Sequence, residues 1–179
     1  MNVSVFGGSQ LNEGSQGYAD ARSLGELLAR RGHTVLTGGY TGTMEAVSRG
    51  AAEAGAHVVG ITCDEIGNWR GLPANRWVAE ERKETTLIER LLALIKGCDA
   101  ALALPGGPGT LAEIALMWNL MIIGAEARRP LILIGDGWGK VWDSLYSELG
   151  DFTPAAQREY LQLAKSPLGA VEALDAWRG

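Results

Sequence analysis

Short apolar runs alternate with longer amphipathic segments along nearly the whole chain. In the segment 17–31, Ala21, Leu24, Leu27 and Leu28 fall on one face of a helix, as in helices that pack on a core. The short runs predict buried strands, which we expect at 2–6, 34–37, 57–62, 100–104 and 130–134, with a weaker one near 160–163. The amphipathic segments predict helices at 17–31, 43–54, 85–96, 110–124, 141–149 and 167–177.

This alternation of strands and helices indicates the fold class. Repeated strand–helix–strand units favour a parallel sheet, and right-handed crossovers place helices on both of its faces. We therefore expect an α/β fold with a Rossmann-like, doubly wound parallel sheet. Nothing that resembles a linker divides the chain, so residues 1–179 are expected to form one domain. The least regular segment, 63–82, is expected to be a loop over a site or a subunit contact.

Composition and charge exclude several functions. The 179 residues carry 16 Lys and Arg against 21 Asp and Glu, for a net charge of -5, and no basic stripe suited to nucleic acid is present. The two cysteines and two histidines are scattered, so no metal site is expected. The longest apolar stretch, 111–125, is interrupted by Glu113 and Asn119 and is too short to span a membrane. Without a leader-like start, the protein is expected to be cytoplasmic.

Glycine-rich turns follow three of the predicted strands. They are Gly7-Gly8-Ser9, Gly38-Gly39-Tyr40-Thr41-Gly42 and Pro105-Gly106-Gly107-Pro108-Gly109-Thr110. The carboxyl ends of parallel strands meet at one edge, where free amides of helix N-termini attract anions. The sequence thus predicts a phosphate or nucleotide site, with these candidate residues: Gly8, Ser9, Gly39, Gly42, Met44, Gly106, Gly107, Gly109 and Thr110.

Two common nucleotide motifs do not fit these loops. Gly107-x-Gly109-x-x-Ala112 matches the dinucleotide fingerprint, but it follows the fourth predicted strand rather than the first and lacks the acidic residue expected downstream. No Gly-Lys-Ser/Thr follows any of the glycine loops, so a Walker A loop is absent. Binding of NAD and hydrolysis of ATP are therefore not expected.

Two charged residues allow both a structural and a functional interpretation. Thr110 and Glu113 have the spacing of a capping box, and spacing alone favours that interpretation over a carboxylate that faces the ligand. A carboxylate beside a phosphate site would instead stabilise a cationic transition state. By itself, Arg90 is expected to be an exposed helical arginine that pairs with Glu89 or Thr86.

The glycine motifs resemble those of a known family. Pro105-Gly106-Gly107-Pro108-Gly109-Thr110-Leu111-Ala112-Glu113 is similar to the PGGxGTxxE signature of the LONELY GUY family, also labelled lysine decarboxylase-like. Gly38-Gly39-Tyr40-Thr41-Gly42-Thr43-Met44-Glu45-Ala46-Val47 resembles its GGxxGxMxAV segment, and Gly7-Gly8-Ser9 its opening turn. The likeness extends from Val3 to about Leu145.

The resemblance implies a nucleotide-binding Rossmann-like domain that forms a homodimer or higher oligomer. It implies hydrolysis of the N-glycosidic bond of AMP or a cytokinin-type nucleotide, which gives free base and ribose 5-phosphate without a cofactor. Glu113 and Arg90 match the family's catalytic residues. Lysine decarboxylation is not expected, because no lysine suited to pyridoxal phosphate is recognisable.

Two positions depart from the family pattern and keep another function open. Leu91 stands where the family has a lysine after its arginine, and Ala112 where a glutamate often precedes the catalytic one. The chain also resembles molybdenum cofactor carrier proteins, so the alternative is a non-catalytic carrier or sensor of a phosphorylated ligand. We expect the homodimer to form at or near the apolar helix 110–124.

Overall fold

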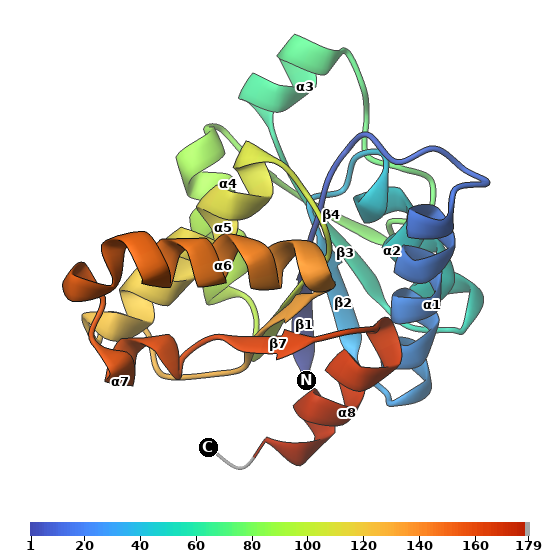
Figure 1. Cartoon of the computed structure of the whole chain (residues 1–179). Coiled ribbons are helices and arrows are strands. Elements are labelled where there is room, and N and C mark those ends of the chain that lie inside the picture. Colours follow the sequence, from blue (N-terminus) through green and yellow to red (C-terminus); the bar gives the residue numbers. More distant parts are fainter. Residues whose placement is uncertain (178–179) are drawn as a thin grey trace.

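One parallel sheet organises the computed structural model, which describes residues 1–177 apart from the side chain of Arg70 (Figure 1). Within these residues the sheet has seven strands in the order β4-β3-β2-β1-β5-β6-β7, and each paired strand runs parallel to its neighbour. The strands are β1 (Asn2–Phe6), β2 (Thr34–Thr37), β3 (Val58–Cys63), β4 (Glu80–Glu84), β5 (Ala100–Ala103), β6 (Leu131–Ile134) and β7 (Gln162–Ala164).

Helices cover both faces of the sheet (Figure 1). They are α1 (Gln16–Arg30), α2 (Thr43–Glu53), α3 (Asp64–Arg70), α4 (Leu87–Lys96), α5 (Pro108–Ile122), α6 (Asp136–Leu149), α7 (Ala155–Arg158) and α8 (Pro167–Ala176), with a 3-10 turn at Gly150–Phe152. Successive strand residues supply the two cores: Val5 packs with α1, α2 and α8, whereas Phe6 packs with α4, α5 and α6. The predicted doubly wound α/β fold is confirmed.

The strand order reverses direction between β1 and β5, and this reversal places the site. From β1 the chain builds outward through β2, β3 and β4, and then returns to add β5, β6 and β7 on the other side. In such a sheet the loops after the two central strands diverge to opposite faces and leave a crevice between them. The loops after β1 and β5 are two of the glycine turns found in the sequence.

The structure corrects the sequence prediction in the segment 63–82. This segment contains the helix α3 and leads into the edge strand β4, neither of which was predicted. Two expected helices also begin earlier than predicted, α5 at Pro108 and α6 at Asp136. Among the described residues, no helix combines the length and apolarity needed to cross a membrane.

Candidate functional site

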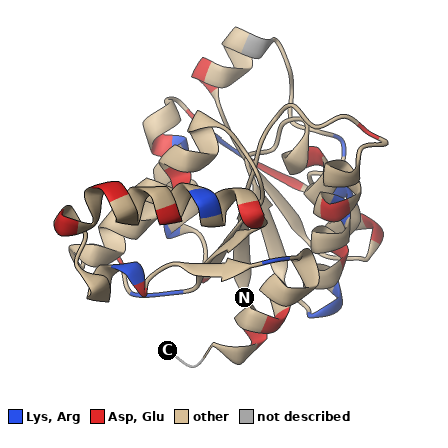
Figure 2. Ribbon diagram, viewed as in Figure 1, with Lys and Arg blue, Asp and Glu red and all other residues tan. Residues whose placement is uncertain are grey.

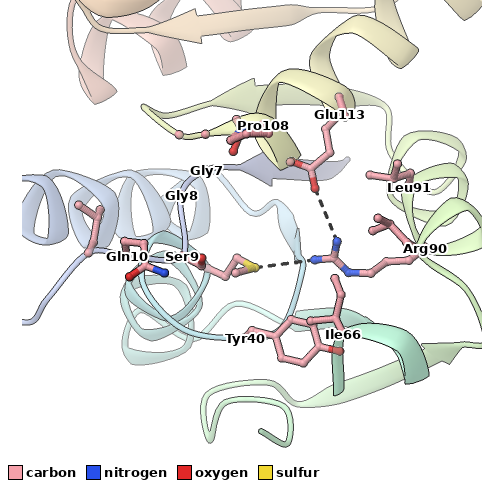
Figure 3. Close-up of a pocket in the computed structure, with 18 of the residues that line it drawn as sticks. Gly7, Gly8, Ser9, Gln10, Tyr40, Ile66, Arg90, Leu91, Pro108 and Glu113 are labelled. Carbon is pink, nitrogen blue, oxygen red and sulfur yellow. Dashed lines mark hydrogen bonds and ion pairs between the residues drawn. The ribbon is translucent and has the colours of Figure 1, made fainter. Parts of the chain in front are cut away.

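A cavity of about 730 Å³ lies at the carboxyl ends of β1 and β5 (Figure 3). Its wall is formed by the glycine loops after these strands, the start of α5, and parts of α3 and α4. Most of the predicted site residues meet here. The predicted residues that line the cavity are Gly8, Ser9, Met44, Arg90, Gly106, Gly107, Gly109, Thr110 and Glu113.

The start of α5 offers free backbone amides to the cavity. Gly107 is the N-cap and Pro108 occupies the first helical position, where its missing N–H costs no hydrogen bond. The helical ladder begins with Leu111, whose N–H donates to the Gly107 carbonyl at 3.0 Å. The amides of Gly109 and Thr110 therefore have no partner within the helix, and they lie at its positive end. This is a suitable site for an anion.

Two glycine loops approach each other so closely that side chains are excluded. The Gly8 N–H donates to the Pro105 carbonyl at 3.1 Å. A Cβ at Gly106 would lie 2.2 Å from Thr110 Oγ1 and 2.9 Å from the Gly8 nitrogen. A Cβ at Gly107 or Gly109, by contrast, would meet no atom within 4 Å. Gly106 thus serves packing, whereas Gly107 and Gly109 leave open space on the cavity side.

Gly39 and Gly42 do not line the cavity but shape the loop beside it. Both have positive φ, +76° and +71°, which favours glycine. A Cβ at Gly42 would lie 2.5 Å from the carbonyl carbon of Ser9, so this glycine lets the loops after β1 and β2 touch. The neighbouring Met44 and Tyr40 do reach the cavity wall.

Arg90 is buried, and the prediction of an exposed helical arginine is wrong. Only 5% of the residue is exposed. Its Nε donates to the Ile61 carbonyl at 2.7 Å and its Nη2 to the Gly38 carbonyl at 3.2 Å. The guanidinium also lies 3.8 Å from Met44 Sδ and 5.7 Å from the centre of the Tyr40 ring. Arg90 therefore ties α4 to the ends of β2 and β3 and presents one edge to the cavity.

The two residues that were expected to pair with Arg90 instead stabilise the start of α4. Thr86 and Glu89 form a complete capping box at the start of α4, in which each side chain bonds the backbone N–H of the other residue. The pKa of Glu89 is lowered because its carboxylate accepts hydrogen bonds from the backbone N–H and the hydroxyl of Thr86, which favour the ionised form.

The capping box predicted for Thr110 and Glu113 is also wrong. Because α5 begins at Pro108, Thr110 lies inside the first turn and Gly107 is the cap, without any side-chain hydrogen bond. Glu113 faces the cavity, where it is only 7% exposed. Its Oε1 lies 3.8 Å from Arg90 Nη1, an ion pair too long for a hydrogen bond (Figure 3).

The burial of Glu113 changes its acidity. Burial disfavours the ionised carboxylate and raises its pKa from 4.5 to about 7, although the Arg90 charge acts in the opposite direction. A carboxyl group with this pKa exists in both protonation states near neutral pH. Such a shift, in a group that lines a cavity next to free helix amides, is typical of functional carboxylates.

Sequence reasoning expected the segment 63–82 to be a loop over a site or a subunit contact, but it did not name the residues that α3 contributes. Ile66 and Trp69 of this helix line the cavity, and Gln10 and Leu11 line it from the loop after β1. Among the described residues, no group of three or more His, Cys, Asp and Glu side chains could hold a metal ion. In the view of Figure 2, basic and acidic residues are interspersed on the helices.

Comparisons with known proteins agree with the motifs. A sequence model of the SLOG cluster4 family matches residues 1–159. The cytokinin riboside 5'-monophosphate phosphoribohydrolase LOG3 of Arabidopsis thaliana is 30% identical over 98% of this chain and 82% of LOG3. An uncharacterised protein of Archaeoglobus fulgidus is 28% identical over 75% of this chain and 85% of its own length.

Solved structures share the fold. The molybdenum cofactor binding protein of Rippkaea orientalis superposes with a TM-score of 0.74 at 26% identity, over 98% of this chain and 95% of that protein. The molybdenum cofactor carrier protein of Chlamydomonas reinhardtii gives a TM-score of 0.72 at 22% identity, over 97% of this chain and 95% of that protein.

Proposed function

The chain belongs to the SLOG cluster4 family of LONELY GUY-like proteins, and on that premise we propose that it is a nucleoside 5'-monophosphate phosphoribohydrolase. The reaction would cleave the N-glycosidic bond of AMP or a cytokinin-type nucleotide and release free base and ribose 5-phosphate. One observation carries this proposal: a buried carboxyl group, Glu113, lies in the same cavity as the start of its own helix, where backbone amides lack helical partners.

The phosphate would bind at the start of α5. The amides of Gly107, Gly109 and Thr110 and the positive end of the helix supply a site for a dianion without a cationic side chain. The open space beside Gly107 and Gly109 lets the phosphate oxygens approach the backbone. Ser9, which also lines the cavity, would contact the phosphate end of the ligand.

Glu113 would act on the ribose. It follows Thr110 by three residues, which is about 4.5 Å along a helix axis, and helical side chains point back toward the N-terminus. A ribose attached to a phosphate at the helix start therefore lies within reach of the carboxylate. As the C1'–N bond breaks, its electron pair leaves with the base and positive charge grows on the sugar. The ionised carboxylate would stabilise that charge.

Water and Arg90 would complete the reaction. The departing base takes a proton, and water adds to C1' and loses one, so atoms and charges balance without a cofactor. Arg90 is held by the backbone of Gly38 and Ile61 and offers only its Nη1 edge to the ligand. We propose that this edge orients Glu113 and the ribose or phosphate.

A carrier or sensor of a phosphorylated ligand is the second candidate. Two observations favour it: Leu91 and Ala112 line the cavity in place of the charged residues of the LONELY GUY pattern, and the fold matches a molybdenum cofactor binding protein. The anion site at α5 serves either function. Incubation of the protein with AMP separates them, because the enzyme releases adenine and ribose 5-phosphate whereas the carrier returns AMP unchanged.

We also propose that two copies pair through the outer surface of α4 and α5. Ile88 of α4 and Leu111 of α5 are large apolar residues that are 62% and 41% exposed, and exposed apolar surface of this kind marks contacts between proteins. Met117 and Met121 belong to the core and cannot contribute to this surface.

A further inference from the structure

The helix α3 covers the side of the cavity that lies away from the phosphate site. Figure 3 shows Ile66 and Pro108 on opposite sides of the cavity, with Arg90 between Glu113 and Ile66. In Figure 1, α3 stands apart from the other helices, beyond the carboxyl ends of the strands. A ligand whose phosphate sits at α5 would therefore extend its other end toward α3.

The position of α3 is fixed by polar contacts in its first turn. Asp64 forms an ion pair with Lys83 at 2.6 Å. Glu65 accepts a hydrogen bond from the Leu87 N–H, at the start of α4, at 2.8 Å. The helix ends at Gly71, which adopts the left-handed conformation with φ +62°. These contacts hold the helix over the cavity although little of it packs on the core.

The residues on both sides of α3 attach it to the catalytic half of the site. Tyr40 donates its hydroxyl to the Cys63 carbonyl at 2.9 Å and accepts from the Cys63 N–H at 3.1 Å, directly before α3. Beyond α3, the Asn75 side chain donates to the carbonyls of Gly39 and Tyr40 at 3.1 and 3.0 Å. The Tyr40 ring lies beside the Arg90 guanidinium. Tyr40 thus supports both α3 and the Arg90–Glu113 pair.

The cavity side of α3 carries an indole that the fold itself does not bury. Ile66 and Trp69 are three residues apart, so they lie on the same helical face, and both line the cavity. Trp69 is nonetheless 78% exposed. A large aromatic surface held at the mouth of a cavity, with uncharged Ile66 beside it, is suited to stack on a planar ring.

We propose that Trp69 forms the base subsite, where its indole stacks on the purine ring of a nucleoside 5'-monophosphate whose phosphate is bound at α5. This inference rests on the proposed function, and it assigns recognition of the base to α3 rather than to the glycine loops. It predicts that Trp69 affects ligands with a base and leaves ligands without a base unaffected.

Calorimetry on the full chain tests the proposal, with Glu113→Gln as the parent protein so that AMP is not consumed. The probes are AMP and ribose 5-phosphate, which carries the phosphate without the base. We expect Trp69→Ala to weaken AMP binding about 5- to 150-fold, because base stacking on an aromatic residue contributes about 1–3 kcal/mol. Binding of ribose 5-phosphate should not change, and Trp69→Phe should retain most of the AMP affinity. Phe152→Ala is the matched control, since Phe152 is 82% exposed and does not line the cavity.

Three results would overturn the proposal, and they have different meanings. Unchanged AMP affinity in Trp69→Ala refutes stacking but leaves the proposed function intact. Unchanged AMP affinity together with a smaller assembly in light scattering shows that Trp69 is a contact between subunits instead. A parent protein that binds ribose 5-phosphate no better than inorganic phosphate, and does not bind AMP, refutes the base subsite and the proposed function together.

Discussion

Replacement of Glu113 by Gln should raise the stability of the protein while abolishing its activity. The amide has nearly the same shape as the carboxyl group and removes only its charge. The structure keeps Arg90 supplied with partners in the variant, because its Nε and Nη2 donate to the carbonyls of Ile61 and Gly38. No capping role is lost, since Gly107 caps α5 without a side chain. The change therefore isolates the charge of one buried carboxylate.

The magnitude follows from the pKa of Glu113. Burial raises this pKa from 4.5 to about 7, so the folded protein holds the proton more tightly than the unfolded chain. The stability that the neutral carboxyl group contributes is present below pH 4.5 and is lost as the pH rises through 7. The loss amounts to about 3 kcal/mol, at 1.36 kcal/mol per pKa unit. The unfolding free energy of Glu113→Gln, relative to the unmodified protein, should therefore increase by about 3 kcal/mol between about pH 4 and pH 8.

Denaturant unfolding at several pH values measures this difference, and Glu172→Gln, at an exposed position of α8, is the control. In parallel, release of adenine from AMP should vanish in Glu113→Gln while AMP affinity stays within a fewfold of the unmodified protein, since the lost interaction matters in the transition state. In the unmodified protein, kcat/KM should rise with pH through about 7 as Glu113 ionises. A flat stability difference would refute the buried ionised carboxylate. Normal turnover by Glu113→Gln would refute its catalytic role.

Three further predictions test other parts of the site and the assembly. Gly109→Ala should leave the melting temperature nearly unchanged but weaken binding of ribose 5-phosphate in calorimetry. Gly106→Ala should instead lower the melting temperature, because the added methyl group clashes with Thr110. If both variants changed the melting temperature and the affinity to the same extent, the two glycines would not have these separate roles. Arg90→Leu should lower the free energy of unfolding, measured with denaturant, by about 2–4 kcal/mol, because two buried carbonyl oxygens lose their donor and Glu113 loses its counter-charge. A loss below about 1 kcal/mol would show that the contacts of Arg90 are not needed for stability. Light scattering at micromolar concentration should report a dimer, and a species of 19.0 kDa alone would exclude the proposed pairing through α4 and α5.

The sheet could be predicted from the sequence where its strands are buried, whereas its edge strand β4 could not. The strands β5 and β6 consist of Leu, Ile and Ala, and their burial on both faces makes the pattern clear. The strand β4 reads Glu-Glu-Arg-Lys-Glu, with its middle residues exposed, and it forms because its backbone pairs with β3. Charged edge strands of this kind resist pairing with other chains. The same charges remove the apolar pattern by which a strand is recognised in the sequence.

The glycine loops that border the cavity could also be predicted, whereas the orientation of Glu113 could not be inferred from spacing. Glycines after parallel strands lead directly to a helix start. Whether Glu113 caps the helix or faces the ligand depends on where the helix begins, and one signal was available: Pro108 favours the first helical position, which places Thr110 inside the helix. Arg90 precedes the buried Leu94 by four residues, so helical periodicity already places it on the core face of α4.

The geometry of Arg90 and Glu113 explains why this pair suits a reaction that develops positive charge. A bidentate ion pair would satisfy the carboxylate and lower its pKa. Arg90 cannot move to form one, because two of its nitrogens are fixed by the backbone of β3 and of the loop after β2, and the nearest oxygen of Glu113 stays 3.8 Å away. The carboxylate therefore remains only partly compensated in its buried position. On the proposed function, its remaining stabilisation comes from the cationic sugar, an interaction that exists in the transition state and not in bound AMP, and such interactions increase turnover.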